Sequence, residues 1–257
     1  MKVNFVADAD EPEAGQIFAH LIFDGHSEKC FWDTGATSTK VVSNYFFAKY
    51  PIVKEGELAG LAGKGVSAAR IQIRNISWGN YSLGQHEVML LSEKLGISPT
   101  AGIDLFKENR FGLDSKTQEV SFEKQDASLT FELGTFGHIL VSPVFNGLRL
   151  HLIWDTGAGL TTIDQKVIDE NPSIFSFIKS LDVGDTVHAK AMQLKLYEAT
   201  NFAIGSVSLK KVQVLGADFS SIKSKLGAQS IQGALGYNVI THFSWYFDLQ
   251  AKKYSVR

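Results

Sequence analysis

One short pattern occurs twice in this chain of 257 residues. It is an apolar residue followed by Trp-Asp-Thr-Gly-Ala, at Phe31–Ala36 and again at Ile153–Ala158. A four-residue match arises at a given position with a probability on the order of 10^-5 from typical residue frequencies. Two copies, each behind an apolar strand-like run, therefore indicate an internal duplication, which limits the fold to architectures with two related halves.

The duplication extends beyond the motif itself. Phe23-Asp24-Gly25 precedes the first motif at the same spacing as Phe145-Asn146-Gly147 precedes the second. A later block, Thr100–Phe106, is similar to Ala234–Ile240. Two copies are too few for a solenoid, so we expect a molecule with two lobes.

Short alternating or apolar runs, separated by turns rich in Gly, Asn and Asp, dominate the sequence, as in antiparallel β proteins. The predicted strands are Ile17–Phe23, Ala69–Ile73, His86–Leu91, Gln118–Phe122, His138–Phe145, Gln193–Tyr197 and Val207–Val214. Short helices are predicted at Ser43–Tyr50, Asp104–Asn109, Asp164–Glu170, Ser173–Lys179 and Asn238–His242. We expect an all-β fold with few short helices. Its two pseudo-symmetric, β-barrel-like lobes would span 1–125 and 126–257, with a cleft between them.

Composition excludes several classes of partner. The net charge of −2 gives no reason to expect nucleic acid or an anionic membrane surface. No apolar run is long enough to span a bilayer. Cys30 is the only cysteine, so no internal disulfide framework exists. The N-terminal residues turn acidic before a signal-peptide apolar region forms, which favours a cytoplasmic location, with a trimmed secreted form as the alternative.

The motif places one carboxylate in each half of the chain, Asp33 and Asp155. Two carboxylates at close range do not both ionise easily, so one keeps its proton near mild pH. The ionised group accepts a proton from a bound water, while the protonated group polarises a carbonyl and later serves the leaving amine. The pair is therefore suited to hydrolysing an amide, provided that the two halves bring the carboxylates together.

The motif neighbours support such a pair. Gly35 and Gly157 permit tight turns and a close approach of the two loops. The hydroxyls of Thr34 and Thr156 are suited to bond the backbone of the opposite loop. The tryptophan before each aspartate is expected to pack into the core. A single motif would be explained more simply as a turn at a strand end, but two copies in register favour a functional pair.

On these residues the chain resembles the aspartic peptidases of the pepsin and retropepsin kind. The family combines an apolar-apolar-Asp-Thr-Gly turn with a later apolar run that ends in Gly, similar to Thr100–Gly102 and Ala234–Gly236 here. The alanine after each motif glycine, at Ala36 and Ala158, makes the chain more similar to retropepsins than to pepsins. Pepsins usually carry Ser or Thr at this position. Without that hydroxyl one hydrogen bond to the ionised carboxylate is lost, so we expect a less acidic optimum than that of pepsin.

The resemblance implies an endopeptidase in which water, activated between the two aspartates, attacks a peptide or protein substrate without a covalent intermediate. It implies no cofactor, and one chain is sufficient to build the site because both halves are present. The scattered histidines form no metal-binding motif, so we expect no metal. His151 is interpreted as an ordinary strand residue and Cys30 as a packing residue.

The family closes its cleft with a β-hairpin flap between the two motif blocks. Glu57–Gly65 is the matching segment in the first half, with Ala59, Gly60, Leu61, Ala62 and Gly63 as candidate substrate-binding residues. Asp182–Thr186 occupies the matching place in the second half. A solvated glycine-rich loop is an equally good interpretation of the first segment.

Two other functions remain open at this point. One is a peptide-binding module on the same fold with weak or no catalysis. The other is an assembly or regulatory domain that pairs through an exposed sheet edge. Carboxylates within hydrogen-bond reach of each other at the floor of an open cleft favour the enzyme, whereas separated or buried carboxylates favour the other two.

Overall fold

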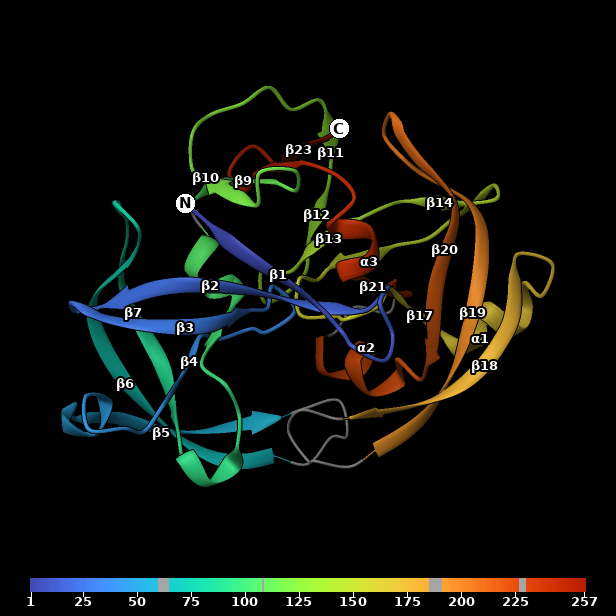
Figure 1. Ribbon diagram of the computed structural model, residues 1–257. Coiled ribbons are helices and arrows are strands. Elements are labelled where there is room, and N and C mark those ends of the chain that lie inside the picture. Colours follow the sequence, from blue (N-terminus) through green and yellow to red (C-terminus); the bar gives the residue numbers. More distant parts are fainter. Residues whose placement is uncertain (60–64, 108, 185–190, 227–229) are drawn as a thin grey trace.

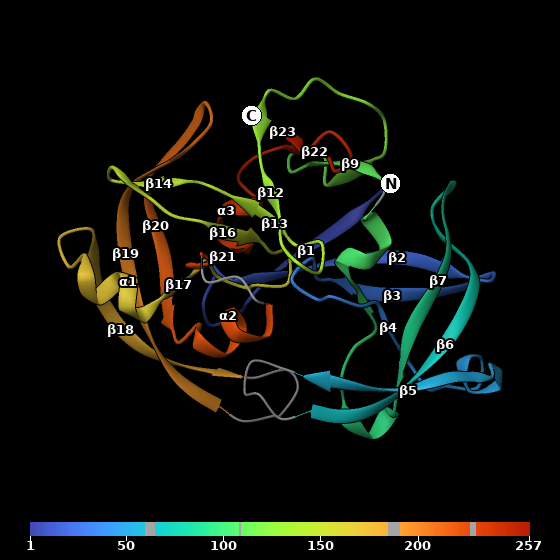
Figure 2. The same ribbon diagram turned by 180° about the vertical axis from the view of Figure 1, so that it is seen from behind.

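The computed structural model describes residues 1–59, 65–107, 109–184, 191–226 and 230–257. Strands dominate the chain, and the predicted all-β class is confirmed. The strands form three sheets, which Figures 1 and 2 show from opposite sides. No helix in these described ranges is long and apolar enough to cross a membrane.

The first sheet has eight strands, all from the first half of the chain, in the order β1-β2-β3-β8-β4-β7-β6-β5. Buried and exposed residues alternate along β2, so one of its faces packs on the core. The strands are β1 (Val3–Ala7), β2 (Gly15–Phe23), β3 (His26–Trp32), β4 (Lys40–Val42), β5 (Ile52–Ala59), β6 (Gly65–Trp78), β7 (Tyr81–Leu91) and β8 (Thr100–Ala101).

The second sheet has ten strands, all from the second half, in the order β12-β13-β16-β21-β17-β20-β19-β14-β15, with β18 paired to β19. It lies on the opposite side of the molecule from the first sheet in both views (Figures 1 and 2). Its strands are β12 (Glu132–Leu133), β13 (Ile139–Val141), β14 (Val144–Phe145), β15 (Leu148–Arg149), β16 (Leu152–Trp154), β17 (Thr162–Asp164), β18 (Phe175–Gly184), β19 (Ala191–Ile204), β20 (Val207–Ala217) and β21 (Gly233–Leu235).

The third sheet combines both halves, in the order β10-β9-β22-β23-β11. It lies at the top of Figure 1, near both termini. Its strands are β9 (Arg110–Asp114), β10 (Glu119–Ser121), β11 (Leu129–Thr130), β22 (Trp245–Asp248) and β23 (Lys253–Val256). The proposed boundary near residue 125 falls between β10 and β11, inside this shared sheet, and stays a prediction.

The strand pairings around the two motifs match. In the first half β3 pairs with β8 in parallel, β8 pairs with β4 in antiparallel fashion, and β4 pairs with β7 in parallel. In the second half β16, β21, β17 and β20 repeat these three pairings in the same order and directions. The duplicated sequence therefore produces the same local backbone arrangement behind each motif.

The helices agree only partly with the sequence. Among the described residues they are α1 (Gln165–Glu170), α2 (Ser220–Leu226) and α3 (Tyr237–Ile240), with short 3-10 turns η1 (Phe47–Lys49), η2 (Glu93–Leu95) and η3 (Ile103–Phe106). The prediction at Asp164–Glu170 is confirmed, and the Asp164 side chain accepts the Lys166 N–H at its N-terminus. The helix predicted at Ser173–Lys179 is wrong because most of this segment belongs to β18, which pairs with β19.

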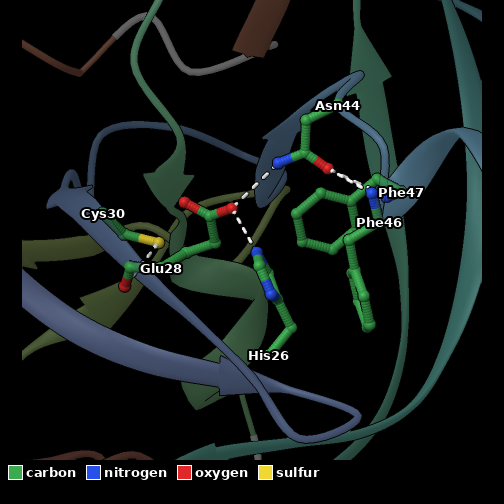
Figure 3. A network of polar contacts seen from close by, with 6 residues as sticks. All are labelled: His26, Glu28, Cys30, Asn44, Phe46 and Phe47. Carbon is green, nitrogen blue, oxygen red and sulfur yellow. Dashed lines mark hydrogen bonds and ion pairs between the residues drawn. The ribbon is translucent and has the colours of Figure 1, made fainter.

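The helix predicted at Ser43–Tyr50 is reduced to η1 by a local side-chain network (Figure 3). The Asn44 Oδ1 atom accepts the N–H groups of Phe46 and Phe47 at 2.9 and 3.0 Å, which favours a tight turn. Its Nδ2 donates to Glu28 Oε1 at 3.1 Å, and His26 Nε2 lies 2.9 Å from the same oxygen. The network therefore ties this turn to the β2–β3 hairpin.

The core joins the two halves through aromatic side chains. Trp32 and Trp154, the residues before each motif aspartate, are both fully buried, with ring centroids 6.0 Å apart. Phe111 contacts both indoles from the shared sheet. The expected burial of the motif tryptophans is confirmed, and it places the two motifs against one common core.

Truncating this core is expected to be costly. Trp32→Ala should lower the free energy of unfolding by about 3–5 kcal/mol, because it removes a fully buried aromatic ring and leaves a cavity. Urea denaturation measures the loss. Tyr45→Ala is the control, since Tyr45 is 97% exposed. Equal losses in the two variants would contradict this account of the core.

Candidate active site

Each motif aspartate lies directly after a central strand, β3 or β16. The backbone N–H of Asp33 donates to the Ala101 carbonyl at 3.0 Å, and that of Asp155 donates to the Leu235 carbonyl at 3.0 Å. Ala101 lies in β8, within the block Thr100–Phe106, and Leu235 lies in β21, within the similar block Ala234–Ile240. The two sequence blocks of each half therefore meet at the aspartate.

Reciprocal hydrogen bonds join the two motif loops. The N–H of Thr34 donates to Thr156 Oγ1 at 3.0 Å, and the N–H of Thr156 donates to Thr34 Oγ1 at 3.0 Å. The Thr34 hydroxyl donates to the Trp154 carbonyl and the Thr156 hydroxyl to the Trp32 carbonyl, each at 2.8 Å. The expected bonds from each threonine to the opposite backbone are thus present, and both threonines are fully buried.

The motif glycines face the opposite carboxylates. A Cβ atom on Gly35 would overlap the Asp155 carboxylate, and a Cβ atom on Gly157 would overlap the Asp33 carboxylate. Only glycine leaves room for the two loops to approach this closely. The glycines therefore set the spacing of the pair as well as the turn of each loop.

The two carboxylates meet at this junction. Asp155 Oδ1 accepts the N–H groups of Gly35 and Gly157 at 3.1 and 2.8 Å. Asp33 Oδ1 accepts the N–H of Ala36 at 2.9 Å. Each carboxylate lies against the glycine of the opposite loop, and Asp33 is close enough to Asp155 to raise its pKa. The structure thus brings the two predicted site residues together, although they lie in different halves of the sequence.

The surroundings of Asp155 raise its pKa. Desolvation is the largest cause that raises the pKa of Asp155, followed by the negative charge of Asp33, and the pKa reaches about 7. The N–H groups of Gly157 and Gly35 act in the opposite direction. Both aspartates remain partly accessible to solvent. The surroundings of Asp155 therefore favour its protonated form in mild acid, at a site that solvent reaches.

A second hydrogen-bond arrangement supports each motif, and the sequence reasoning missed it. Thr39 donates through its N–H and its hydroxyl to the Asp104 carboxylate at 2.9 and 2.8 Å. Thr161 donates in the same way to Asn238 Oδ1 at 2.8 and 2.9 Å. The signal was available, because a threonine follows each motif aspartate at the same spacing. Burial raises the pKa of Asp104, although the bonds from Thr39 oppose this shift.

The predicted flap is only partly described. Ala59 ends β5, where it pairs with Gly65. Gly60, Leu61, Ala62 and Gly63 lie outside the described residues, as do the last two residues of Asp182–Thr186. The described ends of the hairpins β5–β6 and β18–β19 point toward each other in both ribbon views (Figures 1 and 2). A substrate-binding role for the first hairpin stays a prediction.

Other reactive side chains lie apart from the pair. Cys30 is fully buried, and burial raises the pKa of its thiol, which disfavours the reactive thiolate. Its Sγ lies near the Glu28 carbonyl (Figure 3). His151 Nδ1 lies 3.2 Å from Ser142 Oγ. Within the described ranges, no group of three or more His, Cys, Asp and Glu side chains is arranged to hold a metal ion.

No model of a known protein family matches the chain. No curated protein matches it either. Its function is therefore argued from the geometry of the site.

The bonds between the loops are expected to be strongly coupled. Thr34→Val and Thr156→Val should each lower the free energy of unfolding by about 1–3 kcal/mol, because each leaves buried polar groups without partners. The double variant should lose less than the sum, since both changes break one network. Thr37→Val, at an exposed threonine of the first loop, is the control. Additive losses in urea denaturation would contradict a shared network.

Asp104 is expected to make stability depend on pH. Because its pKa is raised in the folded protein, its ionisation costs stability as pH rises above the ordinary value of 3.8. Asp104→Asn places the residue found at Asn238 in the first half. Near pH 3 this variant should melt at nearly the wild-type temperature. Toward neutral pH its melting temperature should exceed that of the wild type by a growing margin of several degrees at most. Asn238→Asp should show the opposite trend. A difference that does not change with pH would refute this assignment.

Proposed function

We propose that this protein is an aspartic endopeptidase in which Asp33 and Asp155 activate one water. The observation that carries the proposal is the close approach of the two carboxylates, assembled from two Asp-Thr-Gly loops that hold each other in place. A protein that only binds peptides gains nothing from crowding two carboxylates. A hydrolase needs one of them protonated and the other ionised at the same pH.

The unequal environments of the pair support a division of roles. Asp155 carries the proton, because its pKa is raised. Asp33 accepts a proton from the bound water, and the resulting hydroxide attacks the substrate carbonyl carbon. Asp155 gives its proton to the carbonyl oxygen, which forms a neutral diol on that carbon. Asp33 then passes its proton to the leaving nitrogen while Asp155 recovers one from the diol, so the C–N bond breaks and both carboxyls return to their starting states.

The fold belongs to the same proposal. The matched strand pairings behind the two motifs support two pseudo-symmetric lobes of the acid-protease kind. One chain then supplies both aspartates, so activity requires no dimer. The substrate is a peptide or protein segment bound in extended form, with the hairpin that contains Ala59–Gly63 as the flap over it.

The dyad is tested by cleavage of an unbiased peptide library from mild acid to neutral pH. Asp33→Asn and Asp155→Asn should each lower kcat by at least about 10²-fold, because each removes one partner in proton transfer. Activity should fall as the pH rises above about 7, where Asp155 loses its proton, and in acid, where both carboxyls are protonated. Asp218→Asn, at an exposed aspartate, is the control.

The proposal fails if the folded wild type cleaves no peptide at any pH. Binding without cleavage would then identify a peptide-binding module. Full activity in either dyad variant would exclude the shared mechanism, and a rate that peaks only in strong acid would contradict the raised pKa of Asp155. Chelators should leave the rate unchanged, since no step uses a metal.

A further inference from the structure

A buried histidine from the second half of the chain contacts the first motif loop. His138 lies just before β13 and is 1% exposed. Its Nε2 lies 2.9 Å from the Gly35 carbonyl oxygen. A carbonyl only accepts, so its partner nitrogen carries the proton, and this fixes the tautomer of the ring. The sequence pattern had identified His138 only as the first residue of a predicted strand.

One peptide unit connects this imidazole to the carboxylate pair. The Gly35 carbonyl and the Ala36 N–H belong to the same peptide group. The carbonyl accepts from His138, and the N–H donates to Asp33 Oδ1 at 2.9 Å. Hydrogen bonds in series polarise one another, so a donor on the carbonyl makes the N–H a stronger donor to the carboxylate.

The second motif lacks this arrangement. The residue at the matching place in the first half is Gln16, which is exposed. In each loop the alanine N–H donates to the backbone carbonyl of its aspartate, at 3.1 Å for Ala36 and 3.2 Å for Ala158. Among the described contacts, the Ala36 N–H also donates to a carboxylate oxygen, that of Asp33, whereas the Asp155 carboxylate takes its N–H donors from the two motif glycines. Two loops of nearly identical sequence therefore differ at the peptide unit that follows each glycine.

The surroundings of His138 favour a neutral ring. Burial is the largest influence and lowers the pKa of His138, and the positive charge of Lys107 acts in the same direction. The Gly35 carbonyl and the negative charge of Asp33 oppose this shift. His138 Nδ1 has no hydrogen-bond partner among the described residues, so the contact with the Gly35 carbonyl is the hydrogen bond that the ring makes there. The imidazole therefore acts as a fixed, neutral donor.

We propose that His138 is a positioning residue that selects Asp33 as the ionised member of the pair, by holding and polarising the Gly35–Ala36 peptide. Asp33 thereby becomes the group that accepts the proton from water, and Asp155 the group that carries one. This role rests on the proposed peptidase function and deepens it. His138 acts through the loop and does not touch the substrate.

Two substitutions separate the hydrogen bond from the bulk of the side chain. His138→Leu removes the donor, whereas His138→Gln keeps an N–H donor of similar reach. His138→Leu should lower kcat roughly 10-fold with little change in KM, as is typical when a supporting partner is lost. The acid limb of the rate profile should move to higher pH, because the ionised form of Asp33 loses support. His138→Gln should restore most of the lost kcat and return the acid limb close to its wild-type pH.

The matched control is His86→Leu. His86 Nε2 also lies 2.9 Å from a backbone carbonyl, that of Leu83, but on a strand outside the motif loops, and its link to the site is an electrostatic one, to the buried Asp104 behind the first loop. This variant should keep the wild-type pH profile. If it shifts the acid limb as much as His138→Leu does, the effect is general and the proposal is overturned.

A second readout does not depend on turnover. Carbon-13 NMR of labelled aspartate carboxyls follows the titration of the pair, assigned with Asp33→Asn and Asp155→Asn. His138→Leu should shift this titration and His86→Leu should not. If the wild type cleaves no peptide but the shift occurs, the peptidase function fails while the control of charge by His138 holds.

An unchanged titration and acid limb in folded His138→Leu would overturn the proposal. Should that variant fail to fold, His138→Asn carries the same test, because its shorter amide does not span the distance to the Gly35 carbonyl.

Discussion

The reciprocal hydrogen bonds between Thr34 and Thr156 are the constraint on which the rest of the structure depends. Each hydroxyl accepts from the opposite backbone and donates to it, so the polar groups of both loops are satisfied inside the core. Buried groups of this kind cost about 1–3 kcal/mol each when left unpaired, which permits only one register between the loops. That register in turn requires Gly35 and Gly157 and brings the two carboxylates into contact.

In a fully symmetric pair the two carboxylates would have the same surroundings, but in this structure their surroundings differ. Asp155 accepts two backbone N–H groups, yet its desolvation and the nearby Asp33 dominate and raise its pKa. Asp33 is supported by the Ala36 peptide, behind which His138 lies. Asp104 likewise replaces the amide of Asn238 with a carboxyl. The strand pairings behind the two motifs are the same, whereas single residues around them differ between the halves.

The pattern of the sequence was sufficient where structure is local or repeated. Alternating runs predicted the all-β class, and the helix predicted at Asp164–Glu170 corresponds to α1. The local pattern predicted a helix at Ser173–Lys179, but most of this segment forms a strand because it pairs with β19. The local pattern also failed to predict β1 and α2, since the first depends on pairing with β2. Strand pairing between distant segments is not encoded in the periodicity of either segment alone.

By itself, the sequence determined that the protein has two related halves, that each carries one Asp-Thr-Gly turn, and which threonines and glycines accompany the aspartates. Only the tertiary structure decided that the two carboxylates meet, that the pKa of Asp155 is raised, and that a histidine 103 residues away from Gly35 contacts its carbonyl. The physical reason is that charge and hydrogen bonding at the pair depend on burial and on donors from distant segments. The repeated motif determines which ionisable side chains are present, whereas burial and neighbouring hydrogen-bond donors determine their pKa values.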